Sequence, residues 1–261
     1  MAAETLDQAI DEIAELILQA KRVVVFTGAG ISTESGIPDF RSPGGIWTKY
    51  NPEDFTYQKF LTSQETRRLT WQRFREIPWT RVQPNAAHLA VAELGKLGKL
   101  DCVITQNVDG LHQRAGNAED RVIELHGTMR WVACLDCGKR YPMEEIAGWL
   151  ERGVEIPRCD ACNGLLKSAT ISFGQAMPVR ETQEAEVRSR NCDLCIVIGS
   201  SLVVYPAAYM PMYALQSGAK LVIINQGETP MDGSAHVRVG AKAGEVMPRV
   251  VERVKARMGL A

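Results

Sequence analysis

The chain has 261 residues, of which 45% are hydrophobic, so it can form one large domain or a large and a small one, with an ample core. Its 30 Lys and Arg are balanced by 31 Asp and Glu, so the protein has no strong net electrostatic field. We therefore expect neither nucleic acid nor a membrane as a partner. No window approaches the ~18 apolar residues of a membrane span and no export signal is present, which predicts a cytoplasmic protein. The seven cysteines then indicate metal binding or buried thiols in a reducing compartment, and the oligomeric state stays open.

The first predicted element is an amphipathic helix. Thr5 and Gln8 have the spacing of a capping box. Apolar residues follow on one helical face: Leu6, Ile10, Ile13, Leu16 and Ile17. We expect this helix to pack on a sheet and to carry no chemistry.

A glycine-rich turn follows in KRVVVFTGAGISTESGIPDFRSPGGIW, residues 21–47. Residues 23–26 are apolar and mostly β-branched, as in a strand buried on both faces of a parallel sheet. Gly28, Ala29 and Gly30 then allow a tight turn and a close approach to a ligand, and residues 32–34 begin a helix whose free N–H groups can hold phosphate. Thr33 replaces the third glycine of the dinucleotide fingerprint G-x-G-x-x-G, so the turn alone is a weak signal.

The residues after this turn carry an acid, an aromatic ring and a guanidinium: Asp39, Phe40 and Arg41. A hydride-transferring Rossmann protein has no need of such groups beside its pyrophosphate turn. In the alternative interpretation, the turn is one of many glycine-rich turns in α/β proteins and Asp39 only caps it.

Residues 43–84 lose strand character and become rich in proline, arginine and aromatic residues, which predicts a helical insertion. Its aromatic residues are Trp47, Tyr50, Phe55, Tyr57, Trp71, Phe74 and Trp79. We interpret its arginines as a solvated helix face in preference to an anion site; they are Arg67, Arg68, Arg73 and Arg75.

Strands and helices alternate through much of the remaining chain. A helix is expected at 86–97, and strands at 102–105, 122–125, 195–198 and 221–224. Small and polar residues follow these strands, at 106–110, 126–127, 199–201 and 225–227. The carboxyl ends of parallel strands lie along one crevice in a doubly wound sheet, so we expect these loops to line a single ligand site.

The predicted fold is α/β, a Rossmann-like doubly wound parallel sheet with a smaller zinc-binding and helical domain. Residues 1–42, 85–128 and 170–261 are assigned to the Rossmann-like domain, which carries the predicted ligand site. Residues 43–84 and 129–169 interrupt the alternation and are assigned to the small domain.

The second interruption contains two C-x-x-C pairs: Cys134 with Cys137, and Cys159 with Cys162. Four thiolates at this spacing can bind one tetrahedral Zn²⁺, and the Gly or Asn-Gly after each pair suits the turn of such a knuckle. Four protein ligands leave no open position, so the zinc is expected to be structural, with a disulfide or redox role less favoured.

Cys192 and Cys195 form a third C-x-x-C pair, at the start of a predicted strand. Positions i and i+3 of an extended segment point to opposite faces. We therefore interpret these two residues, with Cys102, as core thiols.

His126 follows a predicted strand and precedes a glycine, which places its imidazole on the wall of the crevice. A histidine titrates near neutrality and can act there as a general base, although a capped strand end explains the same pattern. His88 lies in a predicted helix and is interpreted as structural, His112 stays open between the two roles, and His236 has no evident role.

Several motifs together resemble the sirtuin family. They are GAGIS and GIPDFR within residues 28–41, TQNVDGLHQRAG at 105–116, ELHG at 124–127, GSSLVVYPA at 199–207 and the two cysteine pairs, and they extend over nearly the whole chain. The resemblance implies an NAD-dependent protein-lysine deacetylase, or deacylase, that transfers the acyl group from lysine to ADP-ribose and releases nicotinamide. It implies NAD as the co-substrate and one structural zinc.

The resemblance also implies roles for individual residues. His126 is the general base that deprotonates a ribose hydroxyl, and Asn107 belongs to the catalytic site with it. The residues implied to bind the cofactor are Gly28, Ala29, Gly30, Ile37, Asp39, Phe40, Arg41, Gln106, Asn107, Asp109, His126, Gly199, Ser200, Ser201, Asn225 and Ala243. The acylated lysine is expected as an added strand between residues 171–174 and 202–205, with contacts from Ile171, Phe173, Gly174 and Val203.

Two positions depart from the family pattern. Gln175 stands where a glutamate often follows Phe-Gly, and Lys242 stands where an aspartate is common, which leaves the fine substrate preference and the adenine end of the site open. A Tyr-x-x-Arg pair, by which some relatives accept succinyl or malonyl groups, is not evident in residues 60–80. We therefore expect a neutral acyl group, acetyl first.

Two other functions stay open. The same reaction centre permits ADP-ribosyl transfer to protein or plain NAD hydrolysis, and a zinc-knuckle module could bind NAD only as a sensed ligand. A hydride-transfer enzyme is disfavoured, because no acidic residue ends a second strand at the spacing that its ribose site needs.

Overall fold

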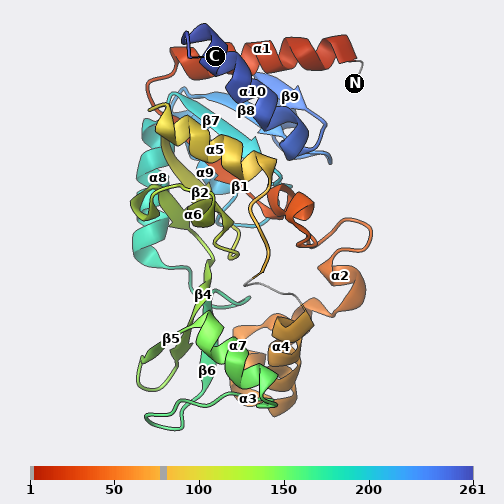
Figure 1. Cartoon of the computed structure of the whole chain (residues 1–261), viewed down its shortest axis with the longest axis vertical. Coiled ribbons are helices and arrows are strands. Elements are labelled where there is room, and N and C mark those ends of the chain that lie inside the picture. Colours follow the sequence, from red (N-terminus) through yellow and green to blue (C-terminus); the bar gives the residue numbers. More distant parts are fainter. Residues whose placement is uncertain (1–2, 77–80, 261) are drawn as a thin grey trace.

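The computed structural model describes residues 3–76 and 81–260 (Figure 1). Residues 1–2, 77–80 and 261 lie outside the described part, and with them Trp79 of the predicted insertion. In the described part the named strands form two sheets, one of six strands and one of three. No described helix combines the length and the apolar composition that a membrane span requires.

The larger sheet has the strand order β3-β2-β1-β7-β8-β9, and its neighbouring strands are parallel. Its strands are β1 (Val23–Thr27), β2 (Leu100–Thr105), β3 (Val122–Glu124), β7 (Leu194–Ile198), β8 (Lys220–Ile224) and β9 (Val237–Val239). Strands β1 and β7 are buried along their whole length, as their continuous apolar sequences require in a sheet covered on both faces. The strand order reverses between β1 and β7, where a doubly wound sheet opens a crevice.

Helices cover both faces of this sheet. On one face, Val23 and Val25 share an apolar cluster with α1 (Ala3–Gln19), α5 (Ala86–Lys96) and α10 (Ala243–Arg257). On the other face, Val24 and Phe26 share a second cluster with α8 (Val179–Asn191) and α9 (Tyr209–Gln216). This two-sided burial confirms the predicted doubly wound α/β fold (Figure 1).

The helix α1 has the expected apolar face, since Ile10, Ile13 and Ile17 are fully buried in the first cluster. The capping box predicted for its start is wrong, because the helix begins at Ala3 and Thr5 lies inside its first turn. The periodicity of apolar residues predicts which face of a helix is buried, but it does not predict well at which residue the helix begins.

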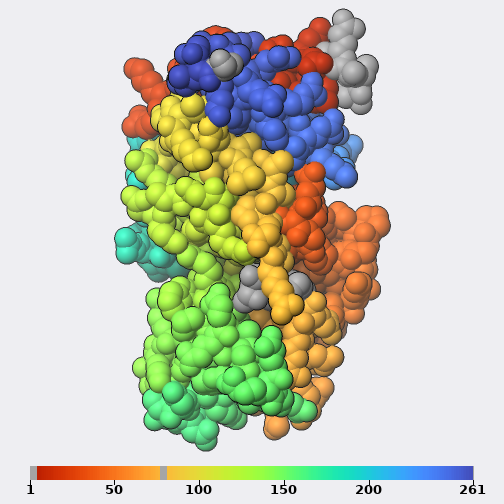
Figure 2. All heavy atoms as spheres, in the orientation of Figure 1, coloured from red at the N-terminus to blue at the C-terminus, as the bar shows by residue number. Residues whose placement is uncertain are grey.

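The smaller sheet is antiparallel and has the order β5-β4-β6: β4 (Gly127–Cys134), β5 (Arg140–Pro142) and β6 (Leu166–Thr170). It packs with α7 (Met143–Glu151) and α4 (Gln64–Glu76) around Trp71 and Ile146. The predicted insertion forms α2 (Ile46–Lys49), α3 (Tyr57–Thr62) and α4, as expected, and a short α6 (Leu111–Arg114) follows β2. The space-filling view shows α3, α4 and the smaller sheet, in orange and green, at the lower end of the molecule (Figure 2).

Candidate active site

The carboxyl ends of β1, β2, β7 and β8 meet at one edge of the larger sheet, as their parallel pairing requires. The loops that follow these strands line a cavity of about 690 Å³, which reaches the β6 strand of the smaller sheet. Every residue assigned to the cofactor from the sequence lines this cavity, from Gly28 on the first loop to Ala243 at the start of α10. The fold thus brings together residues that are far apart along the chain.

The loop after β1 lies directly against the loop after β7. The amide of Gly30 donates to the Gly199 carbonyl at 2.8 Å. A Cβ on Gly30 would lie 2.7 Å from the Gly199 Cα, and one on Gly28 would lie 2.8 Å from the Gly199 oxygen, so both positions require glycine. The helix predicted after this turn is a 3₁₀ helix over Ala29–Ser35, which is tighter than an α-helix.

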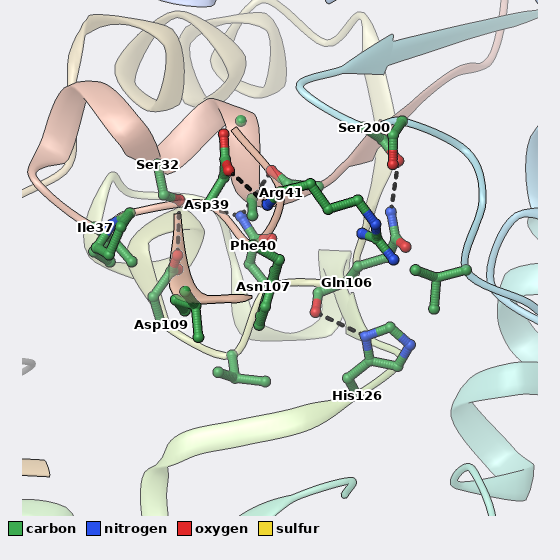
Figure 3. A pocket seen from close by; sticks show the side chains of 18 of the residues that line it. Ser32, Ile37, Asp39, Phe40, Arg41, Gln106, Asn107, Asp109, His126 and Ser200 are labelled. Carbon is green, nitrogen blue, oxygen red and sulfur yellow. Dashed lines mark hydrogen bonds between the residues drawn. The ribbon is translucent and has the colours of Figure 1, made fainter. Parts of the chain in front are cut away.

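Asn107 is the centre of a hydrogen-bonded group on the cavity wall (Figure 3). It is buried, and its side-chain amide donates to the Gly28 carbonyl and to the Ser32 hydroxyl, each at 3.1 Å. The Ser32 hydroxyl donates in turn to Asp109 Oδ2 at 2.7 Å. Burial raises the pKa of Asp109, although its hydrogen bonds with the Leu111 amide and Ser32 oppose this.

Ser32 is a candidate site residue that the sequence analysis missed. It lines the cavity and links Asn107 to Asp109, yet the sequence assigned it only to the start of a helix. Its place inside GAGIS, directly after the glycine turn, is the signal that could have identified it.

Asp39, Phe40 and Arg41 line the cavity beside the first loop (Figure 3). The Asp39 carboxylate accepts hydrogen bonds from the amides of Arg41 and Ser42, at 3.0 and 2.8 Å, so Asp39 does cap this turn. Phe40 is 40% exposed, and its ring centroid lies 5.2 Å from that of Trp47. The Phe40 ring is therefore supported from one side and available to cover a ligand.

His126 lies between β3 and β4, where the chain crosses from the larger sheet to the smaller one (Figure 3). Its Nδ1 lies 3.0 Å from the Gln106 carbonyl oxygen, which can only accept, so Nδ1 carries the proton and Nε2 has a free lone pair. Burial lowers the pKa of His126, opposed by the hydrogen bond to Gln106, and the ring is neutral at pH 7. This tautomer is the one that a general base at Nε2 needs.

Further polar groups come from the loops after β7 and β8. The Gln106 side-chain amide donates to the Ser200 hydroxyl at 2.9 Å, which ties the loop after β2 to the loop after β7. Ser201 and Asn225 line the same cavity, and so does Lys242, the position that departs from the family pattern.

Neither segment predicted to bind the peptide forms a regular strand. Ile171, Phe173 and Gly174 line the cavity, whereas Val203 is exposed beside it and its neighbours Val204 and Tyr205 line it. The Phe173 carbonyl accepts the Tyr57 amide at 2.8 Å, so one edge of this segment is already bonded within the protein.

Arg73 and Lys167 bring positive charge to the part of the cavity beside α4 and β6. The Arg73 guanidinium lies over the rings of Tyr50 and Phe55, 3.8 and 3.7 Å from their centroids. Lys167 is buried, its Nζ donates to the Thr170 carbonyl at 2.5 Å, and burial lowers its pKa to about 8.

The prediction of one solvated arginine face on α4 is wrong for Arg73, which lines the cavity, and for Arg67. Arg67 is only 8% exposed, and its guanidinium donates to the carbonyls of Phe60 and Leu61 at 2.8 and 3.0 Å. The physical reason is that α4 packs against α7 as well as α3, so arginines on several sides of the helix meet protein instead of water.

The four cysteines predicted to bind zinc have their sulfur atoms within 4.8 Å of one another. The Cys134 and Cys162 sulfurs are 3.5 Å apart, and those of Cys137 and Cys159 are 3.6 Å apart. Four thiolates at about 2.3 Å from one tetrahedral Zn²⁺ lie about 3.8 Å from each other, so this donor set fits zinc.

The other cysteines are Cys102, Cys192 and Cys195, which are buried in the apolar cluster of the larger sheet. They belong to no metal-binding group among the described residues, in agreement with their interpretation as core thiols.

A glycine turn at the switch point of a doubly wound sheet and a cavity lined by polar loops are typical of nucleotide-binding α/β proteins. The cysteine cluster adds a structural metal site to this class.

Comparison with known proteins gives the family. The sequence model of the Sir2 family matches residues 28–206, and the chain belongs to this family. The NAD-dependent protein deacetylase of Rhodopseudomonas palustris is 44% identical over 249 residues, which cover 95% of this chain and 98% of that protein.

Two solved structures are similar over most of their length. A Sir2 protein with a p53 peptide and NAD+ has a TM-score of 0.84 and 39% identity, covering 96% of this chain and 98% of that one. A histidine-to-alanine Sir2 variant with a deacetylated p53 peptide and 3'-O-acetyl ADP-ribose has a TM-score of 0.86 and 40% identity, with the same coverage of 96% and 98%.

Proposed function

We propose that this protein is an NAD-dependent protein-lysine deacetylase, which moves the acyl group from lysine to ADP-ribose and releases nicotinamide. The observation that carries the proposal is His126, a neutral imidazole with a free Nε2 in the same cavity as the Asn107 group and the glycine turn. A relative named as an NAD-dependent protein deacetylase, and Sir2 structures with peptide, NAD+ and acetyl ADP-ribose, support the same reaction.

We assign the cavity residues to NAD along its length. The loops of Gly28 to Gly30 and Gly199 to Ser201 would hold the phosphates, since glycine leaves the backbone within reach of them. Gln106 and Asn225 would hold the adenosine ribose, and Ala243 would contact adenine. The residues assigned to the nicotinamide end are Ala29, Ile37, Asp39, Phe40, Arg41, Asn107 and Asp109.

When bound, NAD would supply a ribose carbon that becomes electrophilic as nicotinamide leaves, and the acyl oxygen of the substrate lysine would bond to this carbon on the opposite face. Phe40 covers this carbon and excludes water. Asn107 and Asp109, joined through Ser32, hold the ribose in place. His126 Nε2 would then accept the proton of a ribose hydroxyl, whose oxygen bonds to the acyl carbon. The bond from the acyl carbon to the lysine nitrogen breaks, the free lysine amine leaves, and water supplies the new carbonyl oxygen of the acyl group.

The substrate peptide would lie as an added strand between residues 171–174 and 202–205. The 50% exposure of Phe173 and the 45% exposure of Val203 support this assignment. One structural zinc on the four cysteines would hold the smaller sheet, and four protein ligands leave no position for a substrate.

Residues 43–84 and 129–169 remain our assignment for the small domain, and the rest of the chain for the NAD-binding domain. A cytoplasmic location is also part of the proposal, and it is supported by seven cysteines that form no disulfide.

A neutral acyl group, acetyl first, is the proposed substrate. Arg73 and Lys167 in the cavity favour an acidic acyl group as the second candidate.

The test is to incubate the protein with NAD and lysine peptides that carry acetyl, longer neutral or succinyl groups, and to identify the products by mass. We expect nicotinamide release only with an acyl peptide, together with acyl ADP-ribose. His126→Ala should lower this rate by about 10²- to 10⁴-fold, the usual contribution of a general base. The control is His236→Asn, which keeps an acceptor for the Leu221 amide and lies outside the cavity lining.

Two results would contradict the proposal. One is turnover that survives in His126→Ala. The other is transfer of ADP-ribose to protein without deacylation of any peptide, which would favour the ADP-ribosyl transferase alternative.

A further inference from the structure

Two buried histidines have no part in the reaction described above. His88 is in the first turn of α5 and His112 is in α6, and they are 0% and 2% exposed. Their ring centroids are 5.0 Å apart at an interplanar angle of 60°. Neither residue lines the cavity, so any influence on the site must pass through other groups.

His112 is bonded to the ends of two central strands. Thr27 and Thr105 end β1 and β2 and are paired in register. The Thr27 hydroxyl donates to Thr105 Oγ1 at 2.8 Å, and His112 Nε2 lies 3.0 Å from Thr27 Oγ1. Because Thr27 has a single hydroxyl proton and gives it to Thr105, its oxygen must accept from His112, so His112 carries its proton on Nε2.

The tautomer of His88 follows from its contact with Asn85. Its Nδ1 accepts the backbone amide of Asn85 at 3.4 Å, as part of the cap of α5, so the proton of neutral His88 is on Nε2. In the described part of the chain, His88 Nε2 and His112 Nδ1 have no hydrogen-bond partner. One of the two adjacent rings thus has an unpaired donor and the other an unpaired acceptor, and this complementarity holds only when both rings are neutral.

The hydroxyls of Thr27 and Thr105 connect His112 to the loop after β2. Thr105 Oγ1 accepts the backbone amide of Asn107 at 3.0 Å. The side chain of Asn107 makes the contacts with Gly28 and Ser32, and the carbonyl of the preceding residue, Gln106, fixes the tautomer of His126. A continuous chain of hydrogen bonds thus runs from His112 through Thr27 and Thr105 to the loop that carries the reacting groups.

We propose that His112, supported by its neighbour His88, is a positioning residue for the proposed reaction. It holds the Thr27 and Thr105 hydroxyls in one orientation and thereby fixes the backbone of residues 106 and 107, on which the placement of Asn107 and His126 depends. This inference rests on the proposed function, because it concerns the geometry of that reaction. It assigns His112 no contact with the substrate or with NAD.

The first test compares two amides at position 112. In His112→Gln the side-chain NH₂ is placed like Nε2 and can donate to Thr27, whereas in His112→Asn it is placed like Nδ1 and falls short. We expect nicotinamide release by His112→Asn to have a kcat about tenfold lower, equal to about 1.4 kcal/mol, the scale of one hydrogen bond. The KM for the acetyl peptide should stay unchanged, and His112→Gln should recover most of the kcat.

A double-mutant cycle tests whether the hydroxyls act in the same chain. Thr105→Val keeps the shape of the side chain and removes the oxygen that accepts from Thr27 and Asn107. The combination of Thr105→Val with His112→Asn should lower kcat no further than the more damaging single change. Each variant is first compared with wild type by thermal unfolding, and His236→Asn serves as the control for a changed histidine outside the chain of bonds.

Selective ¹⁵N labelling of histidine, read by NMR at pH 7, tests the tautomers without any turnover. We expect the Nε2–H form for both His88 and His112. If the wild-type protein releases no nicotinamide, the proposed function fails, and this spectrum still decides the tautomers on which the positioning chain depends. Three results would each overturn the inference. The first is a His112 that is charged or carries its proton on Nδ1. The second is an equal loss of kcat in His112→Asn and His112→Gln, and the third is full additivity of the two changes in the double-mutant cycle.

Discussion

The two sheets of this protein are stabilised by different means. The larger sheet has an extensive apolar cluster on each face, built from its strands and five helices. The smaller sheet has a single cluster, which includes Cys134 and Cys159 of the zinc site among its buried residues. We therefore expect apolar burial to suffice for the larger sheet and the smaller sheet to depend on its metal.

The candidate active site lies where these two kinds of structure meet. The loops of the larger sheet supply Asn107, Asp109 and the glycine turn, and the smaller sheet supplies Lys167 on β6. His126 precedes β4, the strand through which the chain enters the smaller sheet. Disturbing either sheet should therefore reduce activity, but with different physical signatures.

Removal of zinc should have the largest effect. Binding of a structural zinc contributes about 10–16 kcal/mol in small domains, so chelation or Cys137→Ser should unfold β4, β5, β6 and α7. Hydrogen exchange followed by mass spectrometry should show loss of protection in these elements, with β1 and β7 still protected, and deacetylation should be lost.

Cys102→Ala is the matched control, because Cys102 is a buried thiol of the larger sheet and not a ligand. It should retain one zinc per chain. Simultaneous loss of protection in both sheets after chelation would show that they form a single cooperative unit, contrary to the comparison.

Gly199→Ala should have the next largest effect and should damage the larger sheet only. Gly199 has φ +63°, and a Cβ there would lie 2.2 Å from the backbone nitrogen of Ile31. The left-handed backbone conformation and the clash together should lower the free energy of unfolding, measured in urea, by about 3–5 kcal/mol. The variant should also bind NAD more weakly. Zinc content should not change.

Gly233→Ala provides the comparison, since a Cβ on Gly233 would meet no atom within 4 Å and its φ is not in the left-handed region. Its unfolding free energy should stay within about 0.5 kcal/mol of wild type. An equally mild effect of Gly199→Ala would mean that the two loops can separate without loss of stability.

The larger sheet was also the more predictable from sequence. Strands β1, β2, β7 and β8 each contain a run of apolar residues, and the rule that ligands bind at the carboxyl ends of such strands leads directly to the loops that line the cavity. The cysteine spacing indicated the zinc site in the same way.

Other features depend on contacts that no local pattern contains. Strands β5 (Arg-Tyr-Pro) and β9 (Val-Arg-Val) have three residues each and contain no run of apolar residues, so no local pattern marks them as strands. Arg73 follows the helical pattern of a solvated residue, and only the rings of Tyr50 and Phe55, brought from earlier in the chain, turn it into a cavity residue. The hydrogen bonds of Ser32 likewise depend on a loop far away in sequence.

Mild acid should weaken the larger sheet specifically, because all four histidines lie outside residues 43–84 and 129–169. Burial lowers the pKa of His88 to about 4 and lowers that of His112 well below its ordinary value. The unfolded chain then binds protons below about pH 6.5 that the folded one does not, so the unfolding free energy should fall with falling pH, by at most about 1.4 kcal/mol per pH unit for each of His88 and His112.

Urea unfolding between pH 7 and pH 5.5 measures this slope, in a range where the carboxylates stay ionised. His88→Gln combined with His112→Gln should reduce the slope, and His236→Asn should leave it at the wild-type value. A wild-type slope that survives in the double variant would assign the acid sensitivity to other groups.

The smallest effect is expected from the surface ion pair of the smaller sheet. Lys139 Nζ lies 2.6 Å from Asp160 Oδ1, but both side chains are exposed, so water and salt screen the pair. Lys139→Met should therefore shift the thermal midpoint too little to separate it from wild type, with zinc retained. Asp160→Asn should cost more, because Asp160 also accepts a hydrogen bond from the buried Tyr141 hydroxyl next to Cys159. If Lys139→Met were the more damaging change, the smaller sheet would depend on its surface charges as well as on its metal.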